Sequence, residues 1–200
     1  IGVNRNTFAL FHDKISGAEI FSIITGQGDA HSILKCIAYV REHEKKIDRL
    51  VVCWGDAVFA NSLPFEELIN GACFSKVAVA CALDEKPYAW FETNEDNEIL
   101  TSHFAKIEGF IDKGLHDQSL FLFDAEFAWK YLNEYREFLG ISYDNDESKA
   151  DINEMKLLDS FEYLYQMGYS RAESVKITAG NVLSFNTQEE LEDIKKMLEI

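Results

Sequence analysis

Basic side chains are scarce in this sequence. Its 200 residues include 19 Lys and Arg against 35 Asp and Glu, so the formal net charge is −16. Proteins that bind nucleic acid through its phosphates use Lys and Arg to displace counterions, and anionic membrane surfaces attract the same side chains. The charge balance therefore argues against nucleic acid and against an anionic membrane as partners.

Long apolar runs and the spacings of several common sites are also missing. No run approaches the roughly 18 to 20 consecutive apolar residues that span a bilayer, and no basic flank followed by an apolar stretch marks the start of the sequence. The cysteines show no C-x-x-C spacing, the histidines show no H-x-x-x-H or H-x-E pattern, and no G-x-S-x-G motif occurs. These absences disfavour a disulfide framework, a zinc hydrolase and a serine nucleophile elbow. We expect a soluble, cytoplasmic protein with buried free thiols.

The sequence does contain a regular alternation of strand and helix signals. Short apolar, β-branched segments predict strands at 21–25, 49–54, 76–83, 119–123, 175–177 and 182–185, with a hairpin at 88–92 and 98–102. Apolar spacing and start signals predict helices at 30–43, from 64, at 125–138, at 152–167, and after Thr187, where Glu190 completes a capping box. This order predicts one α/β domain over residues 1–200, a three-layer sandwich whose mixed sheet is mostly parallel.

Trp54-Gly55-Asp56 ends one of the predicted buried strands. In open α/β sheets, ligands bind beyond the carboxyl ends of the strands. A carboxylate there can hold a divalent cation that in turn binds phosphate oxygens, since magnesium favours one or two protein carboxylates plus phosphates and water. The alternative is structural, with Asp56 capping the next turn.

Gly26-Gln27-Gly28-Asp29 separates a predicted strand from a predicted helix. Such a turn can present backbone N–H groups and a helix N-terminus to a phosphate or a base edge. It can equally be a tight turn with Asp29 as the helix N-cap. Asn186, Glu154 and Asp159 are further candidates, with structural alternatives as a turn residue and as a solvated helix face.

Taken in order, these segments resemble the sugar-phosphate nucleotidyltransferases, most closely the uridylyltransferase domain that makes UDP-N-acetylglucosamine. The matching segments, each followed by the family motif that it resembles, are Gly28-Asp29-Ala30-His31-Ser32 (G-T-A-H-A), Trp54-Gly55-Asp56 (Y-G-D), Lys86-Pro87-Tyr88-Ala89-Trp90 (the G-Y-G-R hairpin turn), 117–123 (N-T-G-I-Y-x-F), 154–159 (E-Y-Y-L-T-D) and 185–187 (V-N-T). Their order covers nearly the whole chain.

The resemblance implies a nucleotide-diphospho-sugar transferase (GT-A, Rossmann-like) fold. It also implies a Mg²⁺-dependent reaction in which a sugar 1-phosphate attacks the α-phosphorus of a nucleoside triphosphate and releases pyrophosphate. By match of position, Asp56 is catalytic and binds Mg²⁺ together with Asn186, and Gly28 and Asp29 lie against the nucleobase. Four further positions match substrate contacts: Trp54, Ala89, Asp117 and Glu154. Homo-oligomerisation is left open.

Three matched positions depart from the family pattern, and one motif is missing. The family threonine is Asp29 here, the hairpin glycine is Ala89, and the asparagine that contacts the sugar is Asp117. Because hydrogen-bond donors and acceptors change, a different hexose or a choline-like alcohol stays open as the substrate. Nothing in residues 1–28 matches the family's G-x-G-T-R loop, so we expect that this chain lacks one or two N-terminal βα units.

Two other functions stay open. A non-catalytic nucleotide-sugar binding or regulatory domain on the same fold would account for the missing loop and the substituted positions. A glycosyltransferase with a D-x-D metal site matches Asp144-Asn145-Asp146 in its letters. That segment, however, lies in a late acidic loop and does not follow a central strand.

Overall fold

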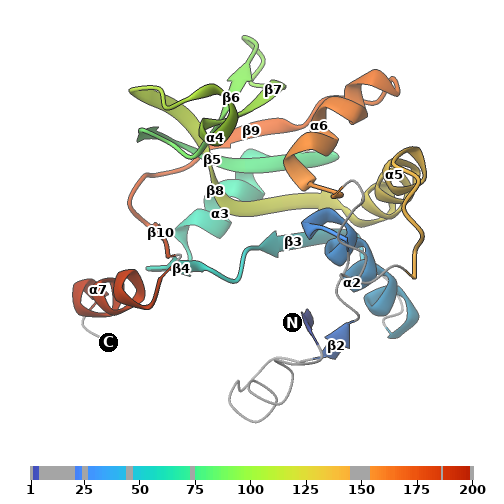
Figure 1. Cartoon of the computed structure of the whole chain (residues 1–200), viewed down its shortest axis with the longest axis horizontal. Helices are drawn as coiled ribbons and strands as arrows, with labels where there is room; N and C mark the ends of the chain where they lie inside the picture. Colours follow the sequence, from blue (N-terminus) through green and yellow to red (C-terminus); the bar gives the residue numbers. More distant parts are fainter. Residues whose placement is uncertain are drawn as a thin grey trace. The chain divides into compact units, whose positions relative to one another are not determined.

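A computed structural model describes residues 2–4, 21–23, 27–43, 47–72, 75–144, 154–185 and 187–198 (Figure 1). Its elements are β1 (Gly2–Asn4), β2 (Phe21–Ile23), α2 (Asp29–His43), β3 (Arg49–Cys53), β4 (Ala57–Phe59), α3 (Leu63–Gly71), β5 (Val77–Glu85), β6 (Ala89–Thr93), β7 (Ile99–Phe104), α4 (Ala105–Glu108), β8 (Lys113–Asp124), α5 (Ala125–Phe138), α6 (Leu157–Gln166), β9 (Glu173–Lys176), β10 (Val182–Ser184) and α7 (Gln188–Leu198). The predicted alternation of strands and helices is confirmed. Asn186 and most of the D-x-D segment lie outside the described residues.

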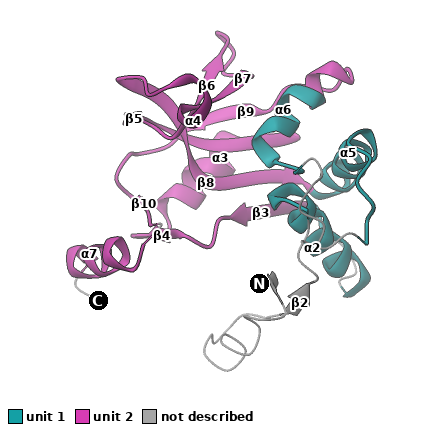
Figure 2. Cartoon of the chain, in the orientation of Figure 1, with its two compact units in different colours: residues 1–48, 125–163 teal, residues 49–124, 164–200 magenta. Residues whose placement is uncertain are grey.

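The chain divides into two compact units (Figure 2). Unit 1 comprises residues 1–48 and 125–163, with α2, α5 and most of α6. Unit 2 comprises residues 49–124 and 164–200 and contains the main sheet. Among the predicted site residues, Gly28, Asp29 and Glu154 belong to unit 1, and Trp54, Asp56, Ala89 and Asp117 belong to unit 2.

The strand directions in unit 2 contradict the prediction of a mostly parallel sheet. The order is β7-β6-β8-β5-β9, and β3 also pairs with β8. Among the described strands of this sheet, only the β5–β9 pair is parallel, and the others are antiparallel. β3, β5 and β9 do run in one direction, but β8 lies between β3 and β5 and runs against both (Figure 1). The apolar runs that predicted these strands carry no information about direction. They also predicted burial on both faces, which is wrong for β3, where Val51 and Cys53 are exposed.

Helix α3 covers one face of this sheet. Side chains alternate along a strand, so every second residue of β5, β8 and β9 points to the same face. The buried cluster there consists of Leu68, Ala72, Ala78, Ala80, Leu120, Leu122, Val175 and Ile177. The alternate residues of β5 and β8, such as Val79 and Phe121, are also fully buried, so these two strands are covered on both faces.

In unit 1, α2 and α5 bury apolar faces at helical spacing, as predicted. The predicted helix at 152–167, in contrast, begins only at Leu157. Met155 donates its N–H to the carbonyl oxygen of Gln27 (2.9 Å), and its own carbonyl oxygen accepts the N–H of Ala30 (3.0 Å). This pairing draws the segment before α6 out of the helix, so the prediction that Glu154 lies on a helix is wrong.

None of the helices in the described ranges has the length and hydropathy of a membrane span. The described cysteines are free thiols, as expected, but only Cys81 is fully buried. Cys36 is half-buried and Cys53 is exposed, which corrects the expectation of burial for these two. Cys53 ends β3, where the sheet meets solvent.

Candidate functional site

The turn before α2 is held against the segment that leads into α6. Gly28 has φ +100°, and a Cβ at this position would lie 2.5 Å from the carbonyl oxygen of Met155 and 2.8 Å from its nitrogen. Side chains rarely adopt this φ, and the neighbouring atoms are main chain that cannot rotate away. Gly28 therefore has a structural reason to be glycine, independent of what the turn binds.

Asp29 joins the same two segments through its carboxylate. Oδ1 accepts the N–H of Ala30 (2.7 Å) and the N–H of Leu157 (2.8 Å). The second bond satisfies an N–H in the first turn of α6, which is the task of an N-cap. Burial raises the pKa of this carboxyl, the two N–H donors lower it, and the charges of Glu154 and Asp159 raise it again. Asp29 thus caps α6 from a distant part of the sequence, whereas the sequence pointed to a cap on α2.

In unit 2, Trp54 follows β3 and is fixed against β8. Its N–H donates to the carbonyl oxygen of Ser119 (3.1 Å), and its ring lies 5.0 Å from that of Phe121 between centroids. The side chain is half-buried, so part of its ring remains accessible.

Asp56 lies two residues further along, at the position predicted for a metal ligand. It is exposed, and its carbonyl oxygen accepts the N–H of Phe185 (3.0 Å). Phe185 immediately precedes Asn186, the other predicted ligand, which lies outside the described residues. The bond therefore ties the neighbour of one predicted ligand to the other.

Asp117 lies in β8 beside a bulge. Val79 pairs with Phe121, whereas Cys81 pairs with Asp117, so three residues of β8 face one residue of β5. Inside the bulge, Ser119 has φ +57° and donates its N–H to Oδ1 of Asp117 (3.1 Å). Ser119 stands where the motif N-T-G-I-Y-x-F has its glycine, and a positive φ is the conformation that favours glycine.

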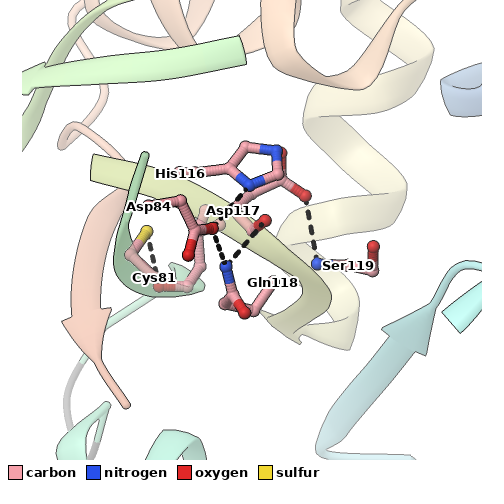
Figure 3. A network of polar contacts seen from close by, with 7 residues as sticks. Cys81, Asp84, His116, Asp117, Gln118 and Ser119 are labelled. Carbon is pink, nitrogen blue, oxygen red and sulfur yellow. Dashed lines mark hydrogen bonds and ion pairs between the residues drawn. The ribbon is translucent and has the colours of Figure 1, made fainter. Parts of the chain in front are cut away.

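Asp117 also belongs to a polar network, in which His116, Gln118 and Asp84 converge beside it (Figure 3). Nδ1 of His116 lies 3.0 Å from Oδ2 of Asp84, and its Nε2 lies 3.7 Å from Oδ2 of Asp117. Gln118 donates from Nε2 to the same oxygen of Asp84 (2.8 Å). No motif indicates these three partners, because Asp84 comes close to His116 and Gln118 only through the register between β5 and β8.

Electrostatics connects Asp117 to the Asp56 turn. Burial raises the pKa of Asp117, and the carboxylates of Asp56 and Asp84 raise it further, against His116 and the N–H of Ser119, which lower it. Trp54, Asp56 and Asp117 all belong to unit 2, and their shared role in a ligand site stays a prediction.

Ala89 and Glu154 are the other two residues that were predicted to bind the substrate. Ala89 is buried in β6 opposite Phe104 of β7, with 2% of its surface exposed. Glu154 is exposed, 4.0 Å from Nζ of Lys156, and its charge acts on Asp29 in unit 1. Their contacts with a substrate remain predictions.

The donor set at Asp56 suits magnesium. An exposed carboxylate and an amide oxygen are hard oxygen ligands, and magnesium keeps its other positions for water and phosphate oxygens. Asp56 and Asn186 would be the protein's two ligands. Among the residues that the structure describes, no group of three or more His, Cys, Asp or Glu side chains is arranged to hold a metal ion.

Comparison with known proteins identifies the fold. No protein-family model matches the sequence, and no curated protein matches it. HddC from Yersinia pseudotuberculosis is 11% identical over 94% of this chain and 71% of its own, with a TM-score of 0.63. The inositol-1-phosphate CTP transferase from T. maritima is 13% identical over 99% of this chain and 74% of its own, with a TM-score of 0.62.

A third structure agrees with these two. The nucleoside-diphosphate-sugar pyrophosphorylase from Vibrio cholerae RC9 is 13% identical over 98% of this chain and 78% of its own, with a TM-score of 0.62. At such identities the likeness concerns the backbone architecture. The chain therefore has the nucleotide-diphospho-sugar transferase fold that the order of its motifs predicted.

Proposed function

We propose that this protein transfers a nucleotidyl group from a nucleoside triphosphate to a sugar 1-phosphate or a similar phosphorylated alcohol. A phosphate oxygen of the acceptor attacks the α-phosphorus in line. The bond from the α-phosphorus to the oxygen that bridges to the β-phosphate breaks, and pyrophosphate leaves. Such transfer depends chiefly on positioning and on neutralisation of phosphate charge. Magnesium, when bound, supplies part of that neutralisation.

The observation that carries this proposal is the Asp56 turn. Its carboxylate is exposed beyond the end of β3, its main chain is bonded to the residue before Asn186, and its charge acts on Asp117. Open α/β sheets bind ligands beyond the carboxyl ends of their strands, and Asp56 lies beyond that end of β3, which runs in the same direction as β5 and β9. The similar structures support the reaction class by their names, and HddC has also been solved with GMP-PN.

The proposal gives each predicted residue a role. Asp56 and Asn186 hold the magnesium ion. Gly28 and Asp29 contact the nucleobase. The phosphorylated acceptor is contacted by Trp54, Ala89, Asp117 and Glu154. Because nucleoside triphosphates and sugar phosphates are soluble metabolites, this function places the protein in the cytoplasm.

The test is pyrophosphate release by the complete gene product with each of five nucleoside triphosphates and a panel of sugar 1-phosphates, with magnesium. For the productive pair, Asp56→Ala should lower kcat/KM by about 100-fold or more, because phosphate charge is then no longer neutralised. Asp96→Ala, at an exposed turn of the β6–β7 hairpin in the same unit, is the matched control and should retain activity.

Two results would contradict the proposal. Full transfer by Asp56→Ala would remove Asp56 from the reaction. Binding of a nucleotide sugar without pyrophosphate release from any pair would favour the non-catalytic binding domain. One observation supports that alternative. Asp29 stands where the family has threonine, and its Oδ1 already accepts hydrogen bonds from two backbone N–H groups.

A further inference from the structure

Asp117 is a buried carboxylate with one oxygen left without a hydrogen bond. The residue is 7% exposed. Oδ1 accepts the N–H of Ser119, but the nearest partner of Oδ2 is Nε2 of His116 at 3.7 Å, beyond hydrogen-bond length. A carboxylate oxygen with a free lone pair can accept a further hydrogen bond, so a donor or a cation that reaches Oδ2 would have a partner there.

The nearest basic side chain, His116, makes its closer contact with Asp84. His116 lies within hydrogen-bond distance of Asp84 through Nδ1, and Gln118, 8% exposed, donates to the same Asp84 oxygen. These two contacts hold the imidazole toward Asp84 and away from closer approach to Asp117 (Figure 3).

The local charge is negative whichever form His116 takes. Three carboxylates act on this position, those of Asp56, Asp84 and Asp117, against the single imidazole of His116. With Asp56 assigned to magnesium, as proposed above, ionised Asp84 and Asp117 against a protonated His116 leave one negative charge. An incoming group with positive charge is therefore favoured here over a neutral or anionic one.

Building on the proposed function, we propose that the phosphorylated alcohol accepted by this protein carries an ammonium group, primary or quaternary, that binds against Oδ2 of Asp117. The family asparagine at this position offers one donor group and one acceptor, whereas a carboxylate offers acceptors alone. Trp54 is half-buried, and its main-chain N–H donates to the carbonyl oxygen of Ser119 in the same bulge of β8. Aromatic faces are a common partner of ammonium groups. A carboxylate group offers Oδ2 no donor and adds negative charge, whereas an acetamido group offers an N–H donor but no positive charge.

The test compares acceptors that differ at one group. Isothermal titration calorimetry of the complete gene product would use glucosamine 1-phosphate, N-acetylglucosamine 1-phosphate and glucose 1-phosphate, with choline phosphate as the quaternary probe. We expect at least one ammonium compound to bind about tenfold or more tightly than the neutral sugars, the size of a charge-assisted hydrogen bond. Equal affinities for charged and neutral probes would overturn the inference.

Variants connect that preference to Asp117. Asp117→Asn keeps an oxygen for the N–H of Ser119 and should reduce the ammonium preference to less than about threefold. Asp112→Asn, an equal change of charge at an exposed position before β8, should keep the preference. If Asp117→Asn proves unstable, Asp84→Asn, one contact further away, should lower the preference partly.

Binding and transfer are read separately. Ammonium preference without pyrophosphate release would support the inference and contradict the proposed function. Pyrophosphate release with equal use of charged and neutral acceptors would support the proposed function and contradict the inference.

Discussion

At Gly28 the backbone adopts φ +100° directly beside the main chain of Met155. Gly28→Ala is expected to lower the free energy of unfolding by about 2 to 4 kcal/mol, because a strained φ and a contact below 3 Å add. Gly140→Ala is the matched control, since φ is +69° there but the space for a Cβ is open. Its expected loss is about 1 kcal/mol. Urea unfolding measures both losses. Equal losses would show that the main chain at Met155 can move away from the added Cβ without a loss of stability.

His31 is a fully buried titratable group of α2. Its Nδ1 accepts the N–H of Gln27 (3.0 Å). Burial lowers the pKa of His31 to about 4, and the charges of Lys35 and Arg136 also lower it, against a backbone hydrogen bond at Tyr143. The folded chain thus keeps this imidazole neutral in a range where the unfolded chain protonates it.

The shift at His31 predicts a loss of stability in acid. Between about pH 6.5 and pH 4 the unfolded state binds one more proton than the folded state at this residue, so the free energy of unfolding falls as the pH is lowered. The contribution reaches about 3 kcal/mol. His31→Gln should remove it, whereas His43→Gln, at the exposed end of the same helix, should not. Urea unfolding at pH 7 and pH 4.5 measures how far the free energy of unfolding falls with pH in each protein. An equal fall in His31→Gln and in the unaltered protein would refute this account.

At the scale of elements, the bulge of β8 carries a testable strain. Ser119 has φ +57°, which costs a residue with a Cβ about 1 kcal/mol relative to glycine. Ser119→Gly is therefore expected to leave the free energy of unfolding unchanged or to raise it by up to about 1 kcal/mol. Ser102→Gly, in the extended strand β7, should instead lose about 1 kcal/mol. Thermal or urea unfolding distinguishes the signs, and equal losses would mean that the bulge favours serine for another reason.

Elements with local signals were predictable from the sequence. Helix α5 has the predicted bounds, 125–138. The capping box of α7 forms as predicted, with Glu190 donating its N–H to Oγ1 of Thr187 (3.2 Å) and accepting the N–H of Thr187 at its own Oε2 (3.0 Å). What failed depends on distant partners: the direction of β8 is set by its neighbours β3 and β5, and the late start of α6 is set by Met155 pairing with Gln27 and Ala30.

Some residues of the candidate site were likewise indicated by the sequence, and others were not. The resemblance assigned Trp54, Asp56 and Asp117 to the site, and all three belong to unit 2. It did not indicate Asp84 or His116, whose contacts follow from the pairing of β5 with β8, nor the capping role of Asp29 toward α6. A sequence shows which residues can bind a ligand, whereas sheet register decides which of them share a position.

At the scale of the whole molecule, the formal net charge of −16 sets the response to salt. Like charges repel more strongly in the compact chain than in the unfolded one, and dissolved salt screens that repulsion. Any added salt should therefore raise Tm, including a magnesium salt. A rise with magnesium alone is consequently no evidence of a metal site.

Matched ionic strength separates screening from binding. At equal ionic strength and with a nucleoside triphosphate present, MgCl₂ should raise Tm more than NaCl, since a ligand that binds only the folded state stabilises it by about 1.4 kcal/mol at ten times its Kd. Asp56→Ala should lose this excess while keeping the rise with NaCl, and Asp96→Ala should keep both. Differential scanning calorimetry of the three proteins measures the two effects. An excess that survives in Asp56→Ala would place the magnesium elsewhere, and the loss of both effects in that variant would indicate damage to the fold.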